Sequence, residues 1–238
     1  MRNRFVFVIP AYNARSTVAQ TLMSLAAQCY PDWHAIILDD MSTDGTPDLI
    51  EMLTHHLNIS GKITLVRNTE KKWEVENVLI GISMCKEDDI VCRLDADDWL
   101  CDIDALAIIN DRYNKLPIDV LWTAHRWSFT NINISNYLPA GADPYTHPWV
   151  SSHFKTFRKS VITRVADENF RGQDGKYFKR IGDQAIYLPV LKCSKGWHFE
   201  PIVSYHYTID LKAENFHTDD AKFQKSEAEY LPMRGFVE

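Results

Sequence analysis

The fold of this chain is decided by residues 5–46, which read FVFVIPAYNARSTVAQTLMSLAAQCYPDWHAIILDDMSTDGT. The apolar runs Phe5–Ile9 and Ala35–Leu38 have the length of strands, and their continuous hydrophobicity is typical of strands buried on both faces. Between them, five side chains at helical spacing fall on one stripe: Val18, Leu22, Leu25, Ala26 and Cys29. A strand, a helix and a second strand in this order predict a βαβ unit with a right-handed crossover and a parallel sheet.

The same alternation of strand and helix continues to about residue 125. Further strand-like runs are Ile63–Val66, Ile90–Leu94 and Val120–Thr123. Two more helical stripes lie between the runs: Leu49, Ile50, Leu53 and Leu57, and then Val75, Val78, Leu79 and Ile82. The pair Thr46-Pro47 predicts a helix start, with Thr46 as the N-cap and Pro47 at the first helical position. We therefore predict an α/β fold with a Rossmann-like, mainly parallel sheet flanked by helices.

The second half of the chain, from about Asn131, loses this rhythm. Residues 131–147 are rich in Asn, Pro, Gly and Tyr and predict a long loop. We expect short helices over Phe154–Val165 and Gln184–Lys192, a strand over Ile202–Thr208, and a polar, weakly helical tail from residue 210. The length suits a single domain over residues 1–238, with one half over about 1–125 and a second half over about 126–238.

Composition excludes several classes of protein. The 238 residues include 26 basic and 32 acidic side chains, a net charge of −6, and no dense basic run that would indicate nucleic acid as a partner. The five cysteines lack CxxC spacing, which favours a reducing compartment. The apolar part of MRNRFVFVIP is too short for a signal peptide, and no run approaches the roughly 18 apolar residues of a membrane helix. We expect a cytoplasmic protein, either soluble or peripheral to a membrane.

Three carboxylates within four residues, Asp95, Asp97 and Asp98, are the strongest functional signal. They follow an apolar strand, and in a doubly wound sheet ligands bind beyond the carboxyl ends of the strands. The cluster is unfavourable unless a cation offsets its charge, and a hard divalent ion does so with carboxylate and phosphate oxygens as ligands. The other interpretation is a solvated turn in which Asp98 caps a helix. The position after a buried strand favours the metal site.

Other groups at the strand ends remain open on the residues alone. Asp40 either accepts hydrogen bonds from turn amides or binds a base or a sugar hydroxyl. Tyr12 either packs or stacks on a ligand. Three indoles lie in the half that would face a second substrate, although core packing is the better expectation for each: Trp122, Trp127 and Trp149. The motifs GxGxxG, GxSxG and HExxH and the P-loop are all absent, which excludes the chemistries that they carry.

In this order, the motifs resemble those of the family 2 glycosyltransferases, which are nucleotide-sugar-dependent, inverting enzymes of the GT-A fold. The resemblance is carried by residues 5–46, then by LVRN and RLDADDWL, and more weakly by HFKTFRKSVI and GDQAIYLPVL. It implies that the first half holds a nucleotide sugar and that the second half holds the acceptor, a glycan or another molecule with a free hydroxyl.

The resemblance implies roles for residues that match the family's motifs. Pro10, Ala11, Tyr12 and Asn13 frame the nucleotide, with the Tyr12 ring stacked on the base. Asp40 bonds the edge of the base, and Arg67 or its neighbours contribute to the base and phosphate site. A pyrimidine imide is then expected, and UDP and dTDP present the same edge.

The acidic run is the DxD motif of that family, with Asp95, Ala96 and Asp97 in the nucleotide-sugar site. Asp97 and Asp98 are the positions closest to ribose and metal, and the implied cofactor is Mn²⁺ or Mg²⁺. Asp183 in Gly182-Asp183-Gln184 matches the catalytic base, although it would also serve as a plain helix N-cap. His206 lies in a part of the chain that closes over the metal in several GT-A enzymes, but we expect a packed or hydrogen-bonded histidine.

The chain also departs from the family. A Gly and an Ala-Arg-Asn usually follow the third strand, whereas this chain has KKWEVEN over residues 71–77 and keeps only the Asn. Trp73 thus replaces a small residue at the donor pocket. The Gln/Arg motif of processive synthases is missing, so we do not expect a polysaccharide synthase of that kind.

Two other functions share the expected fold. A sugar nucleotidyltransferase would carry a glycine-rich, basic loop after the first strand, where this chain has PAYN. A non-catalytic sugar-nucleotide-binding module would have a degraded acidic motif or a lost base, yet Asp95, Asp97, Asp98 and Asp183 are all present. The sugar, the acceptor and the oligomeric state are not indicated by the sequence.

Overall fold

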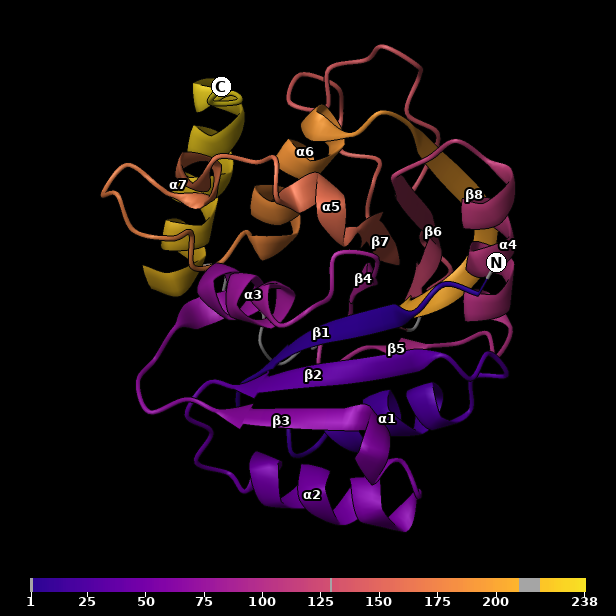
Figure 1. Cartoon of the computed structure of the whole chain (residues 1–238). Helices are drawn as coiled ribbons and strands as arrows, with labels where there is room; N and C mark the ends of the chain where they lie inside the picture. The colour runs from indigo at the N-terminus through magenta and orange to yellow at the C-terminus, as the bar shows by residue number, and fades with distance from the viewer. Residues whose placement is uncertain (1, 129, 210–218) are drawn as a thin grey trace.

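The computed structural model describes residues 2–128, 130–209 and 219–238, and it confirms the α/β class. Eight strands form one sheet in the order β3-β2-β1-β4-β7-β6-β8-β5 (Figure 1). Their bounds are β1 Phe5–Ala11, β2 Trp33–Asp39, β3 Ile63–Arg67, β4 Ile90–Arg93, β5 Trp99–Leu100, β6 Val120–Trp127, β7 Lys155–Arg158 and β8 Trp197–Tyr207. Strands β3, β2, β1 and β4 are mutually parallel, and antiparallel pairing begins where β7 joins β4.

The helices cover both faces of this sheet. Their bounds are α1 Val18–Ala26, α2 Thr46–His56, α3 Trp73–Ser83, α4 Ala105–Lys115, α5 Lys159–Ile162, α6 Gly182–Cys193 and α7 Asp219–Arg234, with 3₁₀ turns at Ser60–Lys62 and Asp167–Phe170. In Figure 1, α1 and α2 lie below strands β1 to β3, while α3 and α6 lie above them. None of the helices in the described part of the chain has both the length and the apolarity needed to cross a membrane.

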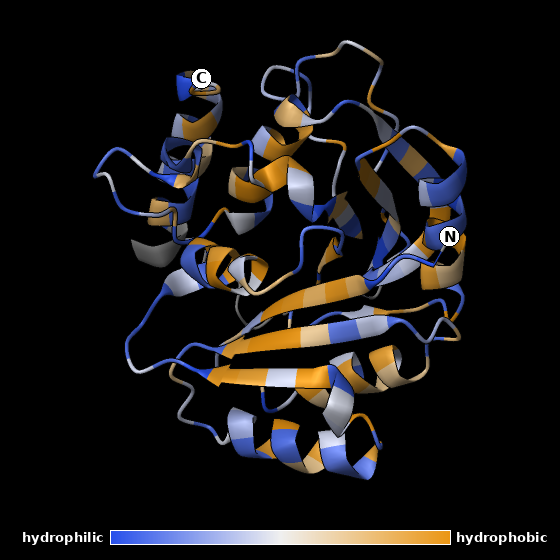
Figure 2. Ribbon diagram, in the orientation of Figure 1, coloured by the Kyte–Doolittle hydropathy of each residue, from blue (hydrophilic) through white to orange (hydrophobic). Residues whose placement is uncertain are grey.

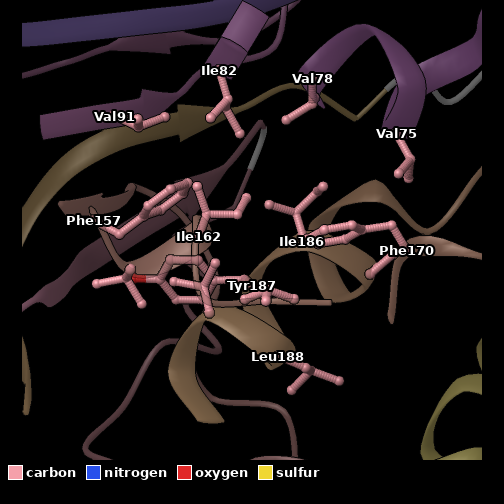
Figure 3. Packing of buried hydrophobic residues seen from close by; sticks show 14 of the residues in the cluster. Val75, Val78, Ile82, Val91, Phe157, Ile162, Phe170, Ile186, Tyr187 and Leu188 are labelled. Carbon is pink, nitrogen blue, oxygen red and sulfur yellow. The ribbon is translucent and has the colours of Figure 1, made fainter. Parts of the chain in front are cut away.

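Alternate side chains of the central strands pack into two hydrophobic cores, one on each face of the sheet. Phe5, Phe7 and Ile9 of β1 pack with α1, α2 and α4, whereas Val6 and Val8 pack with α3 and α6. Figure 3 shows the second core, where side chains of α3 meet Phe157 and the apolar face of α6. Figure 2 shows the matching hydrophobic colouring along β1, β2 and β3. Burial on both faces explains why these strands read as continuous apolar runs.

Several expected elements differ from those observed. The expected helix over Phe154–Val165 is wrong in its first part, because Lys155–Arg158 is strand β7, paired with β4 and β6, and only Lys159–Ile162 is helical. The helix α4 and the short strand β5 were not expected. The loop over residues 131–147 is confirmed. The helical tail is confirmed from Asp219, and residues 210–218 lie outside the described residues.

The start of α2 also differs from the expectation. Thr46 is the first helical residue rather than the N-cap, and Gly45 occupies the cap position with a left-handed φ of 84°. An added Cβ at Gly45 would also meet the Arg15 guanidinium. The carboxylate of Asp44 accepts hydrogen bonds from both the amide and the hydroxyl of Thr46, so Asp44 satisfies the helix terminus instead.

Candidate active site

Two adjoining cavities lie beyond the carboxyl ends of β1, β2 and β4. The sheet extends in opposite directions from the β1–β4 pair, which makes this edge the topological switch point where α/β sheets bind ligands. The first cavity, of about 400 Å³, is lined by Pro10, Ala11, Tyr12, Asp40, Lys71, Trp73, Glu74, Asn77, Arg93, Asp95, Lys179 and Arg180. The lining therefore includes five residues that the sequence predicted for the nucleotide-sugar site: Pro10, Ala11, Tyr12, Asp40 and Asp95.

The second cavity, of about 500 Å³, shares Glu74, Asp95 and Arg180 with the first. Its remaining lining is drawn mainly from the second half of the chain: Asp97, Trp149, Ile181, Asp183, Gln184, Tyr207, Gln224 and Ala228. The expected base Asp183 and the acidic run thus meet in one cavity. Of the three indoles considered, Trp149 lines this cavity, whereas Trp122 is fully buried in the core.

Four of the predicted site residues are not among the described residues that line these two cavities. Asn13 bonds Ser42 and Thr43 in the neighbouring turn. The Ala96 carbonyl accepts hydrogen bonds from hydroxyls of α1 and its N-cap. The Arg67 guanidinium pairs with Asp48 and Glu51 on α2, so its contact with a donor stays a prediction. The fourth residue, Asp98, belongs to the acidic cluster described below.

Asp40 is buried, and its carboxylate organises the start of α3. Oδ1 accepts hydrogen bonds from the Lys72 amide at 2.8 Å and from Asn68 Nδ2 at 2.9 Å. Oδ2 accepts one from the Trp73 amide at 3.0 Å and pairs with Lys71 Nζ at 3.3 Å. Burial would raise the pKa of Asp40, but these donors hold the pKa below its usual value. Asp40 therefore caps a helix and also lines the first cavity.

The Tyr12 ring, about half exposed, faces a cation rather than empty solvent. Lys71 Nζ lies 2.9 Å from the centroid of this ring. The same ammonium forms the ion pair with Asp40. A base stacked on that face of Tyr12 would have to displace the Lys71 ammonium. Lys71 was not singled out by sequence reasoning, since nothing in the local pattern indicated that it reaches across to the end of β1.

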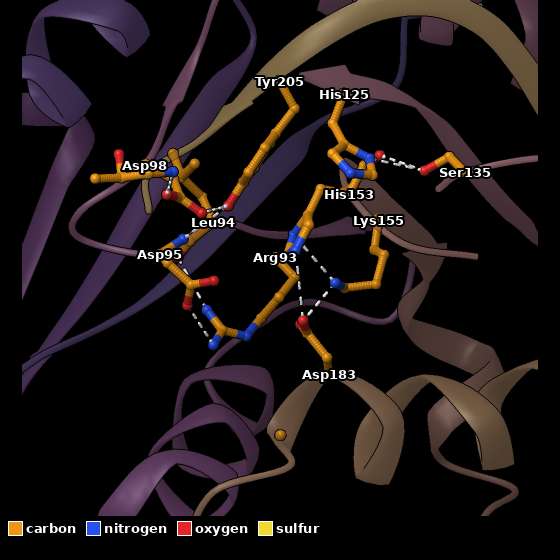
Figure 4. Close-up of polar contacts among 12 residues, drawn as sticks. Arg93, Leu94, Asp95, Asp98, His125, Ser135, His153, Lys155, Asp183 and Tyr205 are labelled. Carbon is orange, nitrogen blue, oxygen red and sulfur yellow. Dashed lines mark hydrogen bonds and ion pairs between the residues drawn. The ribbon is translucent and has the colours of Figure 1, made fainter. Parts of the chain in front are cut away.

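Arg93, the last residue of β4, is the buried cation of the acidic edge. Its guanidinium lies 2.7 Å from Glu74 Oε1. It also lies 2.6 Å from Asp95 Oδ1 (Figure 4). Burial raises the pKa of Glu74 to about 7 despite the adjacent Arg93 charge. The Arg93 guanidinium thus forms ion pairs with two carboxylates, Glu74 and Asp95. It forms none with Asp97 or Asp98.

The other two acids of the run differ in exposure. The carboxylate of Asp98 is buried and accepts hydrogen bonds from the Tyr205 hydroxyl and the Thr208 amide, both at 2.7 Å. Asp97, in contrast, is exposed and lines the second cavity. Desolvation and the neighbouring Asp95 raise the pKa of Asp97 to about 6, and desolvation with Asp95 and Asp97 raises the pKa of Asp98 well above its usual value. The prediction that Asp98 caps a helix does not apply, because its oxygens bond β8 and Thr208.

A divalent cation fits this crowded edge. Ligand atoms of Asp95, Asp98 and His153 lie within 4.8 Å of one another. His153 is buried, and desolvation and the nearby Lys155 lower its pKa well below the usual value, which keeps the imidazole in the neutral form that ligates metals. Of the expected pair of metal ligands, Asp98 belongs to this group and Asp97 lies on the cavity side. His153 was missed because the sequence shows only a histidine ahead of an expected helix.

Asp183 lies at the second position of α6, not at its N-cap, and α6 has no side-chain cap. Its carboxylate lies 2.6 Å from Lys155 Nζ and 3.5 Å from His153 Nε2 (Figure 4). Desolvation would raise the pKa of Asp183, but Lys155, His153 and Arg93 hold the pKa well below its usual range. The interpretation as a plain N-cap is therefore wrong.

His206 is engaged on both ring nitrogens, as expected for a structural histidine. The ring stacks on Trp99 with centroids 3.8 Å apart, Arg126 Nε donates to Nδ1, and Ser128 Oγ lies 3.0 Å from Nε2. It does not belong to the group of possible metal ligands found among the described residues.

Together, the switch-point cavities, the acidic end of β4 and the mixed sheet define the GT-A class of glycosyltransferase folds. The chain belongs to glycosyl transferase family 2, whose family model matches residues 6–166. Among curated proteins, it is 38% identical over 94 residues to the amylovoran biosynthesis glycosyltransferase AmsB of Erwinia amylovora, covering 40% of this chain and 31% of that protein. The matched segments span no more than 32% of the curated relatives' length.

Solved structures share the fold at low sequence identity. Staphylococcus aureus TarS 1-349 in complex with UDP-GlcNAc superposes with a TM-score of 0.67 at 16% identity, covering 87% of this chain and 59% of that one. The mannosyltransferase PcManGT of Pyrobaculum calidifontis, in complex with GDP-Man and Mn²⁺, gives a TM-score of 0.63 at 17% identity, covering 100% of this chain and 66% of that one. These likenesses confirm the predicted fold.

Proposed function

We propose that this chain is a metal-dependent, inverting glycosyltransferase that moves a sugar from UDP or dTDP to a hydroxyl of a glycan or another acceptor. The observation that carries the proposal is the junction of the two cavities, where the acidic end of β4 meets Asp183 from α6. The nucleotide occupies the first cavity and the acceptor the second. Membership of the family favours this function over a nucleotidyltransferase or a non-catalytic module.

In the first cavity, Tyr12 and Asp40 bind the base. Three of the four contacts of the Asp40 carboxylate are hydrogen bonds from Asn68 Nδ2 and from the amides of Lys72 and Trp73. The fourth is the ion pair with the Lys71 ammonium, whose side chain is 30% exposed. Lys71 is the partner that leaves when a pyrimidine N–H arrives. The solved relatives hold different nucleotides, UDP-GlcNAc in TarS and GDP-Man in PcManGT, so the pyrimidine preference rests on Asp40.

Asp95, Asp97 and Asp98, with His153 beside them, are the residues that would hold Mn²⁺ or Mg²⁺. When bound, the cation would offset negative charge on the donor diphosphate. The raised pKa values of Asp97 and Asp98 support a cation here, because a nearby positive charge favours the ionised carboxylates.

Asp183 is the general base. Lys155, His153 and Arg93 lower its pKa and keep the carboxylate ionised at neutral pH, which is the form that accepts a proton, while the same charges reduce its strength as a base. The deprotonated oxygen attacks the anomeric carbon from the face opposite the diphosphate, and this single displacement inverts the configuration. Lys155 and His153 fix the carboxylate in the cavity wall, and Trp149 provides an apolar face there on which an acceptor sugar can stack.

The five free cysteines, two of them buried, support a reducing compartment, and we assign the protein to the cytoplasm, soluble or peripheral to a membrane.

Thermal unfolding with a panel of nucleotides tests the proposal. UDP and dTDP should raise the melting temperature more than GDP and ADP, and Mn²⁺ should increase the shift. A ligand at 100 times its Kd adds about 2.7 kcal/mol to stability, which is readily measured.

Asp97→Ala should remove the effect of Mn²⁺ and abolish turnover, while Asp88→Ala, an exposed acid outside both cavities, serves as the control. Equal shifts with all four nucleotides would contradict the base assignment, and full activity in excess EDTA would contradict the metal.

A further inference from the structure

Two short loops, residues 12–17 after β1 and residues 40–45 after β2, are hydrogen-bonded to each other. The Asn13 amide donates to Ser42 Oγ at 2.8 Å. In the other direction, the Thr43 amide donates to Asn13 Oδ1 at 2.9 Å. We call these two segments the paired loops. Asn13 and Ser42 thus join parts of the chain that lie 29 residues apart in sequence.

Tyr12 lies between two hydrogen bonds that its neighbours make with the second loop. The carbonyl of the residue before it, Ala11, accepts a hydrogen bond from the Asp40 amide at 2.8 Å. The amide of the residue after it, Asn13, is the donor to Ser42 Oγ. Tyr12 is 55% exposed, so the protein interior does not fix its ring. The position of Tyr12 relative to Asp40 therefore depends on these two backbone contacts.

The paired loops also contain backbone conformations that are uncommon for residues other than glycine. Asn13 has a φ of 50° and Met41 a φ of 67°, both in the left-handed region. Asn tolerates this region, whereas Met rarely adopts it. Such conformations persist where surrounding contacts over-determine them, and they are frequent at ligand-binding sites. The Ser42 amide supplies one of these contacts, because it donates to the buried Asp39 carboxylate at 3.1 Å.

We propose that Asn13 and Ser42 are positioning residues for the base of the donor, because they fix where the Tyr12 ring lies. This inference rests on the proposed binding of that base in the first cavity. Tyr12 and Asp40 line this cavity, whereas Asn13 and Ser42 are not among the described residues that line either cavity. Their hydrogen bonds do not involve the acidic run after β4, so the diphosphate part of the site should be unaffected by their loss.

The test compares binding of UDP, uridine and pyrophosphate, each with Mn²⁺, to the wild-type chain and to Ser42→Ala by calorimetry. The variant should weaken UDP and uridine by the same factor, about 3-fold to 10-fold, which is the size expected for one hydrogen bond. Pyrophosphate should bind as it does to the wild type, because it has no base. If the nucleotide panel selects another base, the corresponding diphosphate and nucleoside replace UDP and uridine.

Thr43→Ala is the matched control. It removes a hydroxyl from the same loop, but the amide of residue 43 still donates to Asn13 Oδ1. The Thr43 side chain is exposed, and no hydrogen bond of its hydroxyl is found among the described residues. UDP and uridine should therefore bind to this variant as they bind to the wild type.

Substitutions of Asn13 separate its side-chain oxygen from its backbone conformation. Asn13→Gly accepts the left-handed φ and lacks Oδ1, so it should also weaken uridine by about 3-fold to 10-fold. Asn13→Asp retains an acceptor oxygen and tolerates the same φ, so it should bind uridine as tightly as the wild type. Uridine is the ligand of choice here because it carries no charge that the new carboxylate would repel.

Wild-type uridine affinity in both Ser42→Ala and Asn13→Gly would overturn the inference. An equal loss for pyrophosphate would also overturn it, because the effect would then not be confined to the base. Equal losses in Asn13→Gly and Asn13→Asp would overturn the part given to Oδ1. Should Ser42→Ala fail to fold, Asn13→Gly decides the question. If the wild-type chain bound neither UDP nor uridine, the proposed function would fail, whereas unchanged base affinity in the variants of a nucleotide-binding chain would overturn this inference alone.

Discussion

At the residue scale, the buried side chains around Asp183 set its state. Lys155 is 1% exposed, yet its ammonium reaches the Asp183 carboxylate and His153 Nδ1. A buried charge pair of this kind is costly to break, because removing one partner leaves the other without compensation. The pair therefore keeps a carboxylate ionised inside a cavity wall where burial alone would protonate it.

Asp183→Asn should lower the rate of sugar transfer by about 10²–10⁴-fold, because an amide cannot accept the proton. Donor affinity should remain, since Asp183 does not line the first cavity. Release of UDP from the donor, measured below the melting temperature of the variant, reports the rate. Asp174→Asn, an exposed acid of the preceding segment, is the control. A rate near that of the wild type would place the base elsewhere.

Asp40 should make stability depend on pH. Its pKa in the folded chain lies below the usual value of about 3.9, so its contribution to the free energy of unfolding is present above that value and is lost as the pH falls through the folded pKa. Asp40→Asn should lower the free energy of unfolding by about 1–3 kcal/mol at pH 7, and by less at pH 3. Urea unfolding at both values measures the difference, and an equal loss at both would contradict it.

At the scale of elements, α3 and α6 come together through a glycine at the start of α6. The Gly182 amide donates to Glu74 Oε2 at 3.3 Å, and a Cβ at Gly182 would overlap the Glu74 carboxyl group. Glu74 in turn pairs with Arg93, so the approach of the two helices fixes the acidic edge beside Asp183. The glycine is required here by the close approach of a side chain rather than by its own φ.

Gly182→Ala should therefore destabilise the fold by about 1–3 kcal/mol, the usual cost of adding a methyl group where there is no room. It should also weaken donor binding, since Glu74, whose carboxyl group the new methyl group would displace, lines both cavities. Gly61→Ala is a matched control, because a Cβ there meets nothing within 4 Å. Chemical unfolding of the two variants gives the comparison. Equal free energies of unfolding for Gly182→Ala and Gly61→Ala would contradict this prediction, because the Glu74 side chain would then move away from the methyl group at little cost.

At the scale of the whole molecule, the two halves share one sheet and both hydrophobic cores. Strand β4 of the first half pairs with β7 of the second, and the core over α3 contains Val75 and Val78 together with Ile186 and Leu188 (Figure 3). We therefore expect residues 1–238 to unfold as one unit, although we propose that the two halves bind different substrates.

Urea unfolding followed by tryptophan fluorescence and by far-UV circular dichroism should give coincident transitions. The nucleotide that binds best should move both midpoints together, because it stabilises the only folded state. A fragment of residues 1–125 serves as the comparison and should not fold cooperatively, since β4 would lose its partner β7. Two separate transitions in the full chain would show that the halves are independent domains.

The sequence by itself determined the βαβ elements of the first half and the edge of the sheet at which the candidate site residues gather. Strands β1 and β2 and helix α1 follow from local hydrophobic periodicity, which depends on residues a few positions apart. Parallel strands meet at one edge, so the order of the strands along the chain is enough to place Tyr12, Asp40 and Asp95 together. Helix α4 was not expected, although Leu106, Ile109 and Tyr113 are at helical spacing.

Only the tertiary structure decided what the side chains at that edge contact. Phe154, Phe157 and Val161 are spaced as in a helix, but pairing with β4 and β6 makes Lys155–Arg158 a strand and brings Lys155 to Asp183. The pKa of a buried carboxylate depends on charges within a few ångströms, whatever their distance along the chain. No local pattern connects Lys155 with Asp183, because the sheet and α6 bring these partners together only in the folded molecule.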